Sequence, residues 1–197
     1  MLFKFLQSIL RLFFNIVYDI EVVGAENLPK DGSAIVCANH ISFLDPLLLG
    51  AFLDRHLHFM AKYELFKFPP LAWLLTKLGA FPVNRQSVEI TSLKRALEVL
   101  KNGKAMGIFA QGGRDKAVVH EDDGKAGVAM FAVRGAAPVI PVGIKGSFWA
   151  FTRITINIGA PMRFEEPEGK KLRAAELSLL TKEIMREIKC LSERTDP

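Results

Sequence analysis

The stretch SAIVCANHISFLDPLLL, residues 33–49, contains the pattern that decides the fold. Residues 33–38 form a continuous run of small apolar side chains, which is typical of a strand buried on both faces of a sheet. Asp45 and Pro46 then have the composition of a helix start, with Asp predicted at the N-cap and Pro at N1. A buried strand, a short loop at 39–44 and a helix indicate one unit of an α/β fold.

The same alternation continues in both directions from this stretch. Further strands are predicted at residues 20–23, 57–61, 80–83, 105–109, 139–144 and 153–158. Further helices are predicted at 63–78 (interrupted at Pro69-Pro70), 87–100, 125–134 and 172–191. The pattern predicts an α/β fold with a mostly parallel central sheet flanked by helices. Residues 19–197 contain no repeat or long linker and are predicted to form a single domain.

Residues 1–18 are predicted to form an amphipathic helix at a membrane interface. The polar residues of LFKFLQSILRLFFNIVY, residues 2–18, fall on one stripe that covers roughly a third of the helix circumference. The remaining surface is apolar, as in helices that lie in the plane of a bilayer. An uninterrupted apolar run of about 18 residues, as a membrane span requires, is missing, and no small-residue signal-peptide cleavage site follows. A core helix of the domain remains the alternative.

Composition limits the function classes. Half of the 197 residues are hydrophobic and 24% are charged, which excludes a disordered chain. The net charge of +5 suits an anionic partner, which could be a nucleic acid, an anionic bilayer or a phosphorylated substrate. The two cysteines are far apart and the four histidines lack zinc-site spacing, so we expect no disulfide framework, metal or cofactor.

His40 and Asp45 are the candidate catalytic residues. His40 follows a buried strand and Asp45 opens the next helix, and ligands of α/β sheets bind at such strand-to-helix loops. The carboxylate can orient the imidazole, which can then take a proton from a hydroxyl and contribute about 10²–10⁴ in rate. The spacing is also common by chance, and Asp45 could be only a helix cap. We interpret Ser42 as loop hydrogen bonding and Cys37 as strand packing.

Several candidate anion-binding residues also follow predicted strands. Arg85 ends the segment GAFPVNR, residues 79–85, and Lys62 follows the strand at 57–61. A guanidinium can bind phosphate through paired hydrogen bonds. A third strand leads into Gln111, Gly112, Gly113 and Arg114, where glycines allow backbone N–H groups to approach an anion. Solvated surface cations and an ordinary tight turn are the alternatives for these residues.

Residues 137–142, APVIPV, indicate a buried strand with prolines at its entry and within it. Because proline cannot donate to the strand ladder, this buried strand is expected to lie at the edge of a groove.

These four blocks, in this order, resemble the glycerophospholipid acyltransferase family, which includes the 1-acylglycerol-3-phosphate acyltransferases. The resemblance runs from about residue 22 to 142 and makes His40 and Asp45 the catalytic pair. It assigns substrate phosphate binding to Arg85, Lys62, Gln111, Gly112, Gly113 and Arg114. It associates Val139, Ile140 and Pro141 with the acyl groove.

The third block departs from the family pattern F-P-E-G-T-R at three positions. Ala110 replaces Pro, Gln111 replaces Glu, and Gly113 replaces Thr. Gln can still donate and accept hydrogen bonds but carries no negative charge. The departures bear on the identity of the acceptor more than on the type of reaction.

The resemblance implies transfer of an acyl group from acyl-CoA or acyl-carrier protein to the sn-2 hydroxyl of 1-acylglycerol-3-phosphate, giving phosphatidic acid. The expected partners are this lysophospholipid and a membrane surface, at the cytoplasmic face, and no nucleic acid. Another lysophospholipid or lipid alcohol could be the acceptor instead. A lipid hydrolase is disfavoured because no G-x-S-x-G nucleophile elbow is present. A non-enzymatic protein that binds anionic membranes is the alternative from another class.

Overall fold

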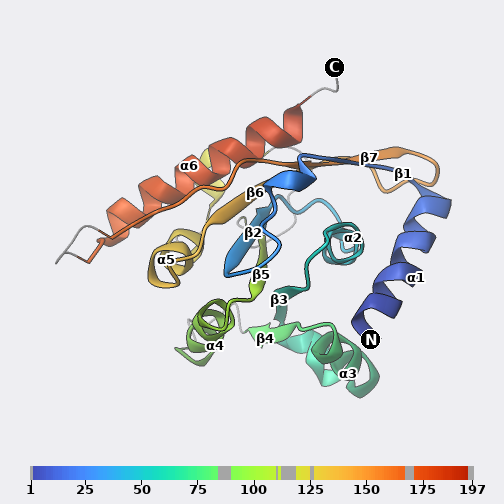
Figure 1. Cartoon of the computed structure of the whole chain (residues 1–197), viewed down its shortest axis with the longest axis horizontal. Coiled ribbons are helices and arrows are strands. Elements are labelled where there is room, and N and C mark those ends of the chain that lie inside the picture. Colours follow the sequence, from blue (N-terminus) through green and yellow to red (C-terminus); the bar gives the residue numbers. More distant parts are fainter. Residues whose placement is uncertain are drawn as a thin grey trace.

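The structure is a computed structural model that describes residues 2–83, 90–109, 111, 119–124, 127–166 and 171–194. Helices and strands alternate along these residues (Figure 1). The strands are β1 (Asp19–Val23), β2 (Ala34–Ala38), β3 (Leu57–Lys62), β4 (Phe81–Val83), β5 (Ala105–Phe109), β6 (Val139–Gly146) and β7 (Arg153–Ile158). The α-helices are α1 (Leu2–Val17), α2 (Asp45–Phe52), α3 (Pro69–Lys77), α4 (Ile90–Lys101), α5 (Gly127–Arg134) and α6 (Ala174–Glu193). Short 3-10 turns are η1 (Ala25–Asn27), η2 (Tyr63–Lys67) and η3 (Glu121–Asp123).

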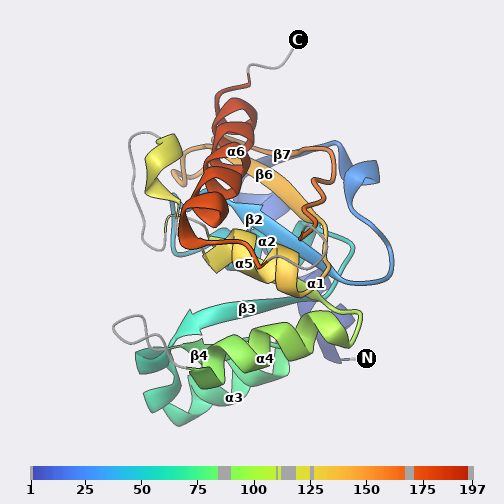
Figure 2. The ribbon, with the colours of Figure 1, turned by 90° about the vertical axis from the view of Figure 1, so that its left-hand side faces the viewer.

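The described strands form one sheet in the order β1-β7-β6-β2-β5-β3-β4. Neighbouring strands pair in parallel except for β6 and β7, which are antiparallel. The predicted α/β fold with a mostly parallel, helix-flanked sheet is therefore confirmed. Figure 2 shows β3 and β4, together with α3 and α4, below the rest of the molecule.

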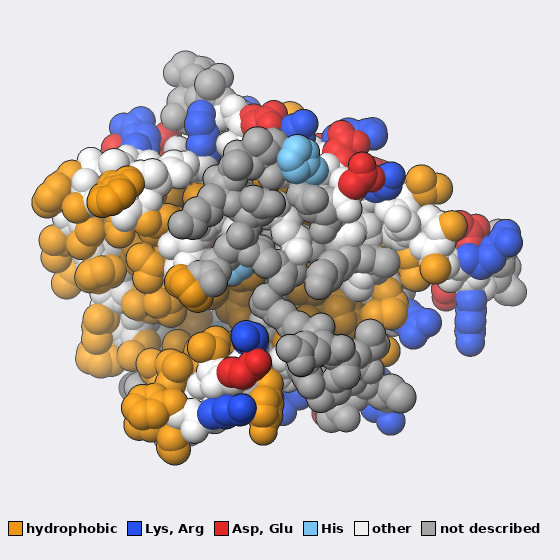
Figure 3. Space-filling view, turned by 180° about the vertical axis from the view of Figure 1, so that it is seen from behind, with side chains coloured by type: hydrophobic (Ala, Val, Ile, Leu, Met, Phe, Trp, Pro, Cys, Tyr) orange, Lys and Arg blue, Asp and Glu red, His pale blue; other side chains and the backbone are white. Residues whose placement is uncertain are grey.

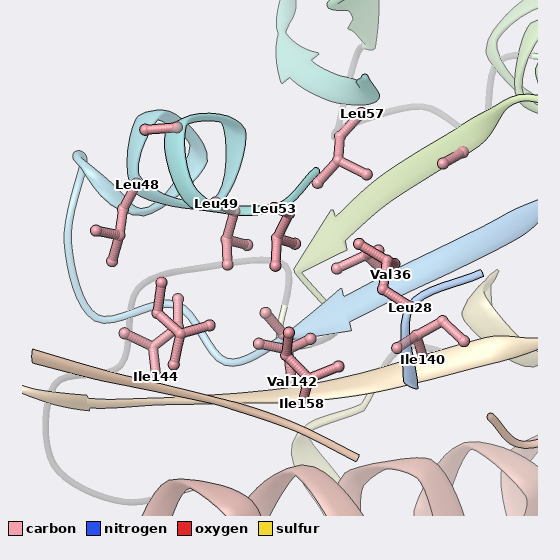
Figure 4. Close-up of a cluster of buried hydrophobic side chains, with 14 of the residues drawn as sticks. Leu28, Val36, Leu48, Leu49, Leu53, Leu57, Ile140, Val142, Ile144 and Ile158 are labelled. Carbon is pink, nitrogen blue, oxygen red and sulfur yellow. The ribbon is translucent and has the colours of Figure 1, made fainter. Parts of the chain in front are cut away.

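The two faces of the sheet build two hydrophobic clusters. Along β2, Ala34, Val36 and Ala38 face the cluster under α1 and α2, whereas Ile35 and Cys37 face α4, α5 and α6. This alternation is the two-residue period of a strand. Figure 4 shows the leucines of α2 lying over β2 and β6. Full burial of such a leucine contributes roughly 1.5–3 kcal/mol relative to exposure, so α2 and the loop that precedes it are firmly fixed to the sheet.

Helix α1 forms over nearly the whole predicted segment. Two residues of its polar stripe, Gln7 and Arg11, contact the protein, whereas Lys4, Ser8 and Asn15 are exposed. The Gln7 side chain donates to the carbonyl oxygens of Gly50 and Leu53, both at 3.0 Å. Arg11 Nε donates to Ala51 O at 3.0 Å. These bonds satisfy carbonyl groups at the end of α2, which have no partner within that helix.

The apolar side of α1 is divided between the core and the surface. Phe14 is fully buried in the cluster under α1 and α2. Five large side chains are exposed by about half or more, namely Phe5, Ile9, Leu12, Phe13 and Ile16. A core helix would turn these side chains inward, so the core-helix alternative explains only part of α1. None of the helices within the described ranges has the length and hydropathy to cross a membrane.

One local prediction is corrected. Leu44, not Asp45, occupies the N-cap of α2, because the Asp45 carboxylate turns back to the preceding loop. The predicted interruption at Pro69-Pro70 is present: the 3-10 turn η2 ends at Lys67 and α3 starts at Pro69, where a missing N–H costs no hydrogen bond. Pro141 lies in the buried interior strand β6, and its carbonyl oxygen accepts from the N–H of Gly159, just beyond the end of β7, at 2.9 Å.

Candidate active site

The candidate site lies at the carboxyl edge of the parallel strands. His40 follows β2 by two residues, Gln111 follows β5 by two residues, and Lys62 is the last residue of β3. Since β2, β5 and β3 are neighbours and run in parallel, their carboxyl ends meet at one edge of the sheet. Residues far apart in the sequence are thereby brought together.

The predicted contact between His40 and Asp45 is present. His40 Nδ1 lies 2.7 Å from Asp45 Oδ2, and the Asp45 side chain is fully buried. The same oxygen accepts hydrogen bonds from the backbone N–H groups of Ile41 at 2.7 Å and Ser42 at 2.8 Å. Three donors therefore converge on one carboxylate oxygen, and the loop before α2 is closed around it.

This arrangement fixes the tautomer of the neutral imidazole. A carboxylate only accepts hydrogen bonds, so Nδ1 must carry the proton and Nε2 is left as the acceptor nitrogen. An imidazole held in this way can take a proton through Nε2, and the buried carboxylate stabilises the imidazolium that forms. The geometry is that of a general base with its orienting acid.

Aromatic rings support the imidazole from one side. The His40 ring stacks on Phe109 with centroids 4.1 Å apart, and Phe59 lies beyond Phe109 with centroids 5.9 Å apart. Gly107 makes room for this stack, because a Cβ at that position would lie 2.3 Å from Phe59 Cε1. The stack, like the carboxylate, limits the positions open to the ring.

The backbone around His40 is held by two amide side chains. Gln111 Oε1 accepts from the His40 N–H at 3.3 Å, and Gln111 Nε2 is buried without a hydrogen-bond partner. The buried Asn39 side chain donates to Ile144 O at 2.9 Å and accepts from Ile144 N at 2.7 Å. Asn39 thus ties the loop to β6, a role that we did not predict from the sequence. Its position between a buried strand and the histidine was the available signal.

A cavity of about 430 Å³ opens beside His40. Its walls come from α1, α2, β3, η2 and α3 and are almost entirely apolar. The volume is within the range of small-molecule sites. Polar groups on its lining include His40, Gln7 and Lys62. Figure 3 shows that hydrophobic side chains also gather on the outer surface along this side of the molecule.

Lys62 lies on the cavity wall but is engaged by a neighbouring acid. Its Nζ lies 3.3 Å from Glu64 Oε1, and both side chains are about half exposed. The pKa of Glu64 is lowered by a hydrogen bond from its own backbone N–H and also by Lys62. An exposed pair of this kind contributes little to stability because water screens it, so an anionic ligand can compete for the lysine.

The remaining predicted site residues divide into two groups. Arg85, Gly112, Gly113 and Arg114 lie outside the described residues. The structure does not bring the predicted acyl-groove residues Val139, Ile140 and Pro141 to the cavity. They lie in the interior strand β6, where the first two are fully buried in the core clusters, so no ligand can reach them.

Within the described ranges, no three His, Cys, Asp or Glu side chains are grouped so that they could hold a metal ion. Cys37 is buried in β2 and Cys190 is exposed on α6. The chemistry available at the site is therefore that of an oriented histidine beside an apolar cavity and a cation.

Comparison with known proteins identifies this arrangement. A family model described as Acyltransferase matches residues 19–145. A 1-acyl-sn-glycerol-3-phosphate acyltransferase of Bacillus subtilis (strain 168) is 29% identical over 202 residues, which cover 99% of both chains. The chloroplastic 1-acyl-sn-glycerol-3-phosphate acyltransferase LPAT1 of Arabidopsis thaliana is 31% identical over 73% of this chain and 42% of its own.

A solved structure shows the same fold. The crystal structure of the 1-acyl-sn-glycerophosphate (LPA) acyltransferase PlsC from Thermotoga maritima superposes with a TM-score of 0.73 at 30% identity. The match covers 99% of this chain and 81% of that one. The family model spans more than half of the sequence, and the solved structure matches it along nearly the whole chain, so this chain belongs to the acyltransferase family.

Proposed function

We propose that this enzyme transfers a fatty acyl group to the sn-2 hydroxyl of 1-acylglycerol-3-phosphate and forms phosphatidic acid. The observation that carries the proposal is the His40–Asp45 pair, which opens onto an apolar cavity with Lys62 on its wall. Relatives along nearly the whole chain are named as acyltransferases for this acceptor. The donor is acyl-CoA or acyl-carrier protein, both of which are thioesters.

In the proposed reaction His40 is the general base. Nε2 takes the proton of the acceptor hydroxyl as its oxygen attacks the thioester carbonyl carbon. A new ester C–O bond forms, the C–S bond breaks, and the thiolate leaves with the proton from the imidazolium. Asp45 stabilises the imidazolium between these two steps. No covalent acyl-enzyme is required.

The cavity is the proposed site of an acyl chain. An alkyl chain gains roughly 0.8 kcal/mol for each methylene group that it transfers from water to apolar surroundings. Gly50 of α2 lines this cavity, and a Cβ at Gly50 would meet no atom within 4 Å. Unoccupied space therefore lies directly beside the helix that carries Asp45.

The acceptor phosphate is proposed to bind Lys62, with Arg85, Arg114 and the backbone of Gly112 and Gly113 as further predicted contacts. Binding the phosphate positions the adjacent hydroxyl for proton transfer, which contributes through orientation. The ion pair with Glu64 keeps Lys62 at the cavity wall until a more highly charged group displaces the carboxylate.

The enzyme is proposed to act at the cytoplasmic face of a membrane. The outward apolar side of α1 supports this location, since Gln7 and Arg11 are held by the end of α2 and large apolar residues of the helix are left exposed. Such a helix lies in the bilayer interface with its apolar side in the lipid. Phe3 and Leu10 of the same helix line the cavity, so an acyl chain could enter from lipid depth.

A donor and acceptor panel tests the proposal. The purified chain is given lysophosphatidic acid, other lysophospholipids or no acceptor, with acyl-CoA or acyl-carrier protein, and the products are identified by lipid mass spectrometry. We expect phosphatidic acid as the main product, and its loss in His40→Ala. His120→Ala is the matched control. Free fatty acid released without an acceptor would indicate a hydrolase. A different acylated lipid as the main product would show that the enzyme uses another acceptor.

A further inference from the structure

The loop between β6 and β7, residues 147–152, exposes two large aromatic side chains. Trp149 is 79% exposed and Phe151 is 86% exposed, the two highest values among the large hydrophobic residues of the described chain. We propose that this aromatic loop is a second lipid-contact site, which fixes the rotation of the enzyme about the axis of α1. The inference rests on the proposed membrane location.

The aromatic loop is held rigidly in its exposed conformation. Thr152 Oγ1 lies 2.6 Å from Ser147 O and 2.7 Å from Trp149 O, so its single hydroxyl proton is shared between two carbonyl groups and the loop is closed on itself. Phe151 has a φ of 63°, in the left-handed region that bulky residues rarely adopt. The exposure of both rings is thus a fixed feature of the backbone, and neither ring needs to be withdrawn from a core before it meets a ligand.

Hydrogen bonds join the aromatic loop to the C-terminal end of α1. The Phe151 N–H donates to Val17 O at 2.7 Å, and the Asp19 N–H donates to Thr152 O at 3.1 Å. Tyr18 packs edge-on against Phe148 with ring centroids 5.7 Å apart. Figure 1 shows the connection between β6 and β7 beside the end of α1. The loop and the helix therefore move as one unit.

The chemistry of the loop fits a bilayer interface. Residues 147–152 read SFWAFT and contain no charged side chain. Tryptophan favours the interface because its ring is apolar and its N–H can remain hydrated. Phe13 and Ile16 are exposed near the end of α1 to which the loop is hydrogen-bonded, and Figure 3 shows hydrophobic side chains on the side of the molecule where α1 lies. The net charge of +5 adds attraction to anionic lipids.

Geometry explains why a second contact is useful. A single interfacial helix fixes its own axis in the plane of the membrane but leaves the attached domain able to roll about that axis. Phe3, Gln7 and Leu10 of α1 line the cavity, so rolling would turn its walls toward or away from the lipid. A rigid aromatic contact beyond the end of α1, on the β6–β7 connection, limits this roll.

Tryptophan fluorescence tests the contact directly. The chain has two tryptophans, so Trp73→Phe leaves Trp149 as the only one. We expect the emission of Trp149 to shift to the blue on vesicles of phosphatidylcholine and phosphatidylglycerol, and to be quenched by brominated phosphatidylcholine. Emission that stays unchanged while the protein co-floats with the vesicles would overturn the inference.

A double variant tests the contribution to binding. Trp149→Gln with Phe151→Asn removes both rings, and Asn tolerates the left-handed backbone at 151. We expect vesicle partitioning to fall by about tenfold or more, with unchanged turnover of a water-soluble, short-chain acceptor. Leu179→Gln on α6, where Leu179 is 66% exposed, is the matched control and should bind as the wild type does.

The outcomes separate this inference from the proposed function. Vesicle binding needs no turnover, so a wild-type protein that binds through Trp149 but forms no phosphatidic acid would refute only the proposed function. A double variant that partitions as the wild type does would refute only the second contact. If the wild type sediments as a dimer and the double variant as a monomer, a second copy of the chain covers the loop. This result would also overturn the inference.

Discussion

Asp45→Asn separates the charge of the catalytic acid from its geometry. In the wild type, Asp45 Oδ2 accepts from His40 Nδ1 and from the N–H groups of Ile41 and Ser42, all within 2.8 Å. In the variant, the two fixed backbone donors require an oxygen at that position. The amide NH₂ must then replace Oδ1, which is buried and has no hydrogen-bond partner. The imidazole keeps its proton on Nδ1, and only the negative charge is lost.

The size of the effect follows from this geometry. In the Ser-His-Asp proteases, the corresponding substitution gives the wrong tautomer and lowers kcat by about 10⁴. Here the tautomer is retained, so the loss is limited to the attraction between the imidazolium and the carboxylate. Unit charges about 4 Å apart interact by about 4 kcal/mol at an effective dielectric of about 20. We therefore expect kcat/KM to fall by about 10²–10³.

Release of the donor thiol is measured with purified Asp45→Asn and His40→Ala. An unfolding curve is recorded for each variant. Asp45→Asn should lose at most about 1–3 kcal/mol of unfolding free energy, for one buried donor without an acceptor. Asp45→Ala leaves the Ile41 and Ser42 N–H groups unsatisfied and should lose more. Wild-type activity in folded Asp45→Asn, or a loss as large as that of His40→Ala, would refute the reasoning.

Further predictions concern the cavity, the cation and stability. Gly50→Leu should shift the acyl preference toward shorter chains in a chain-length series, and an unchanged preference would place the acyl chain elsewhere. Gly50→Ala should raise the free energy of unfolding by about 0.5–1 kcal/mol. Glu64→Gln should lower the KM for an anionic acceptor at low salt by releasing Lys62, and a raised KM would contradict this. Gly107→Ala should displace Phe59 and lower stability by about 1–3 kcal/mol; a wild-type melting temperature would show that the ring stack is dispensable. Burial lowers the pKa of His58 below its ordinary value. The stability that depends on neutral His58 should therefore be fully present above about pH 6.5 and fall as the pH is lowered below it. The free energy of unfolding should fall less steeply with pH in His58→Gln; equal slopes in the variant and the wild type would show that His58 does not cause the pH dependence.

Much of the fold could be predicted because the strands are short apolar runs bounded by strong turn signals. The buried run of β2 and the Asp-Pro start of α2 placed both elements within a residue or two of their observed ends. The order of the strands was harder, because β2 pairs with β5 and β6 through contacts that no local pattern encodes.

In the site, too, contacts within one stretch of sequence could be predicted and contacts between distant segments could not. The spacing of His40 and Asp45 predicted their contact, because both lie in one loop and one helix start. Local sequence could not reveal that the Asp45 carboxylate also binds two backbone N–H groups, nor that Asn39 ties the loop to β6. The cavity was assigned to β6 in the sequence interpretation. Its actual walls combine α1, α2, β3 and α3, and only their packing creates the space.

The polar stripe of α1 could be predicted from the sequence, but the contacts of its members could not. Gln7 and Arg11 bind the carbonyl groups at the end of α2, whereas Lys4, Ser8 and Asn15 are exposed. A helical pattern gives the angle between residues but does not tell which side of the helix packs on the protein.

The central claim is that His40 is the general base of an acyl transfer to a lysophospholipid. The most direct test is a single-turnover experiment with purified protein, lysophosphatidic acid and acyl-CoA, in which the wild type and His40→Ala are compared under identical vesicle conditions. Our account predicts phosphatidic acid from the wild type and almost none from a folded His40→Ala. Phosphatidic acid formed by His40→Ala at the wild-type rate would contradict it.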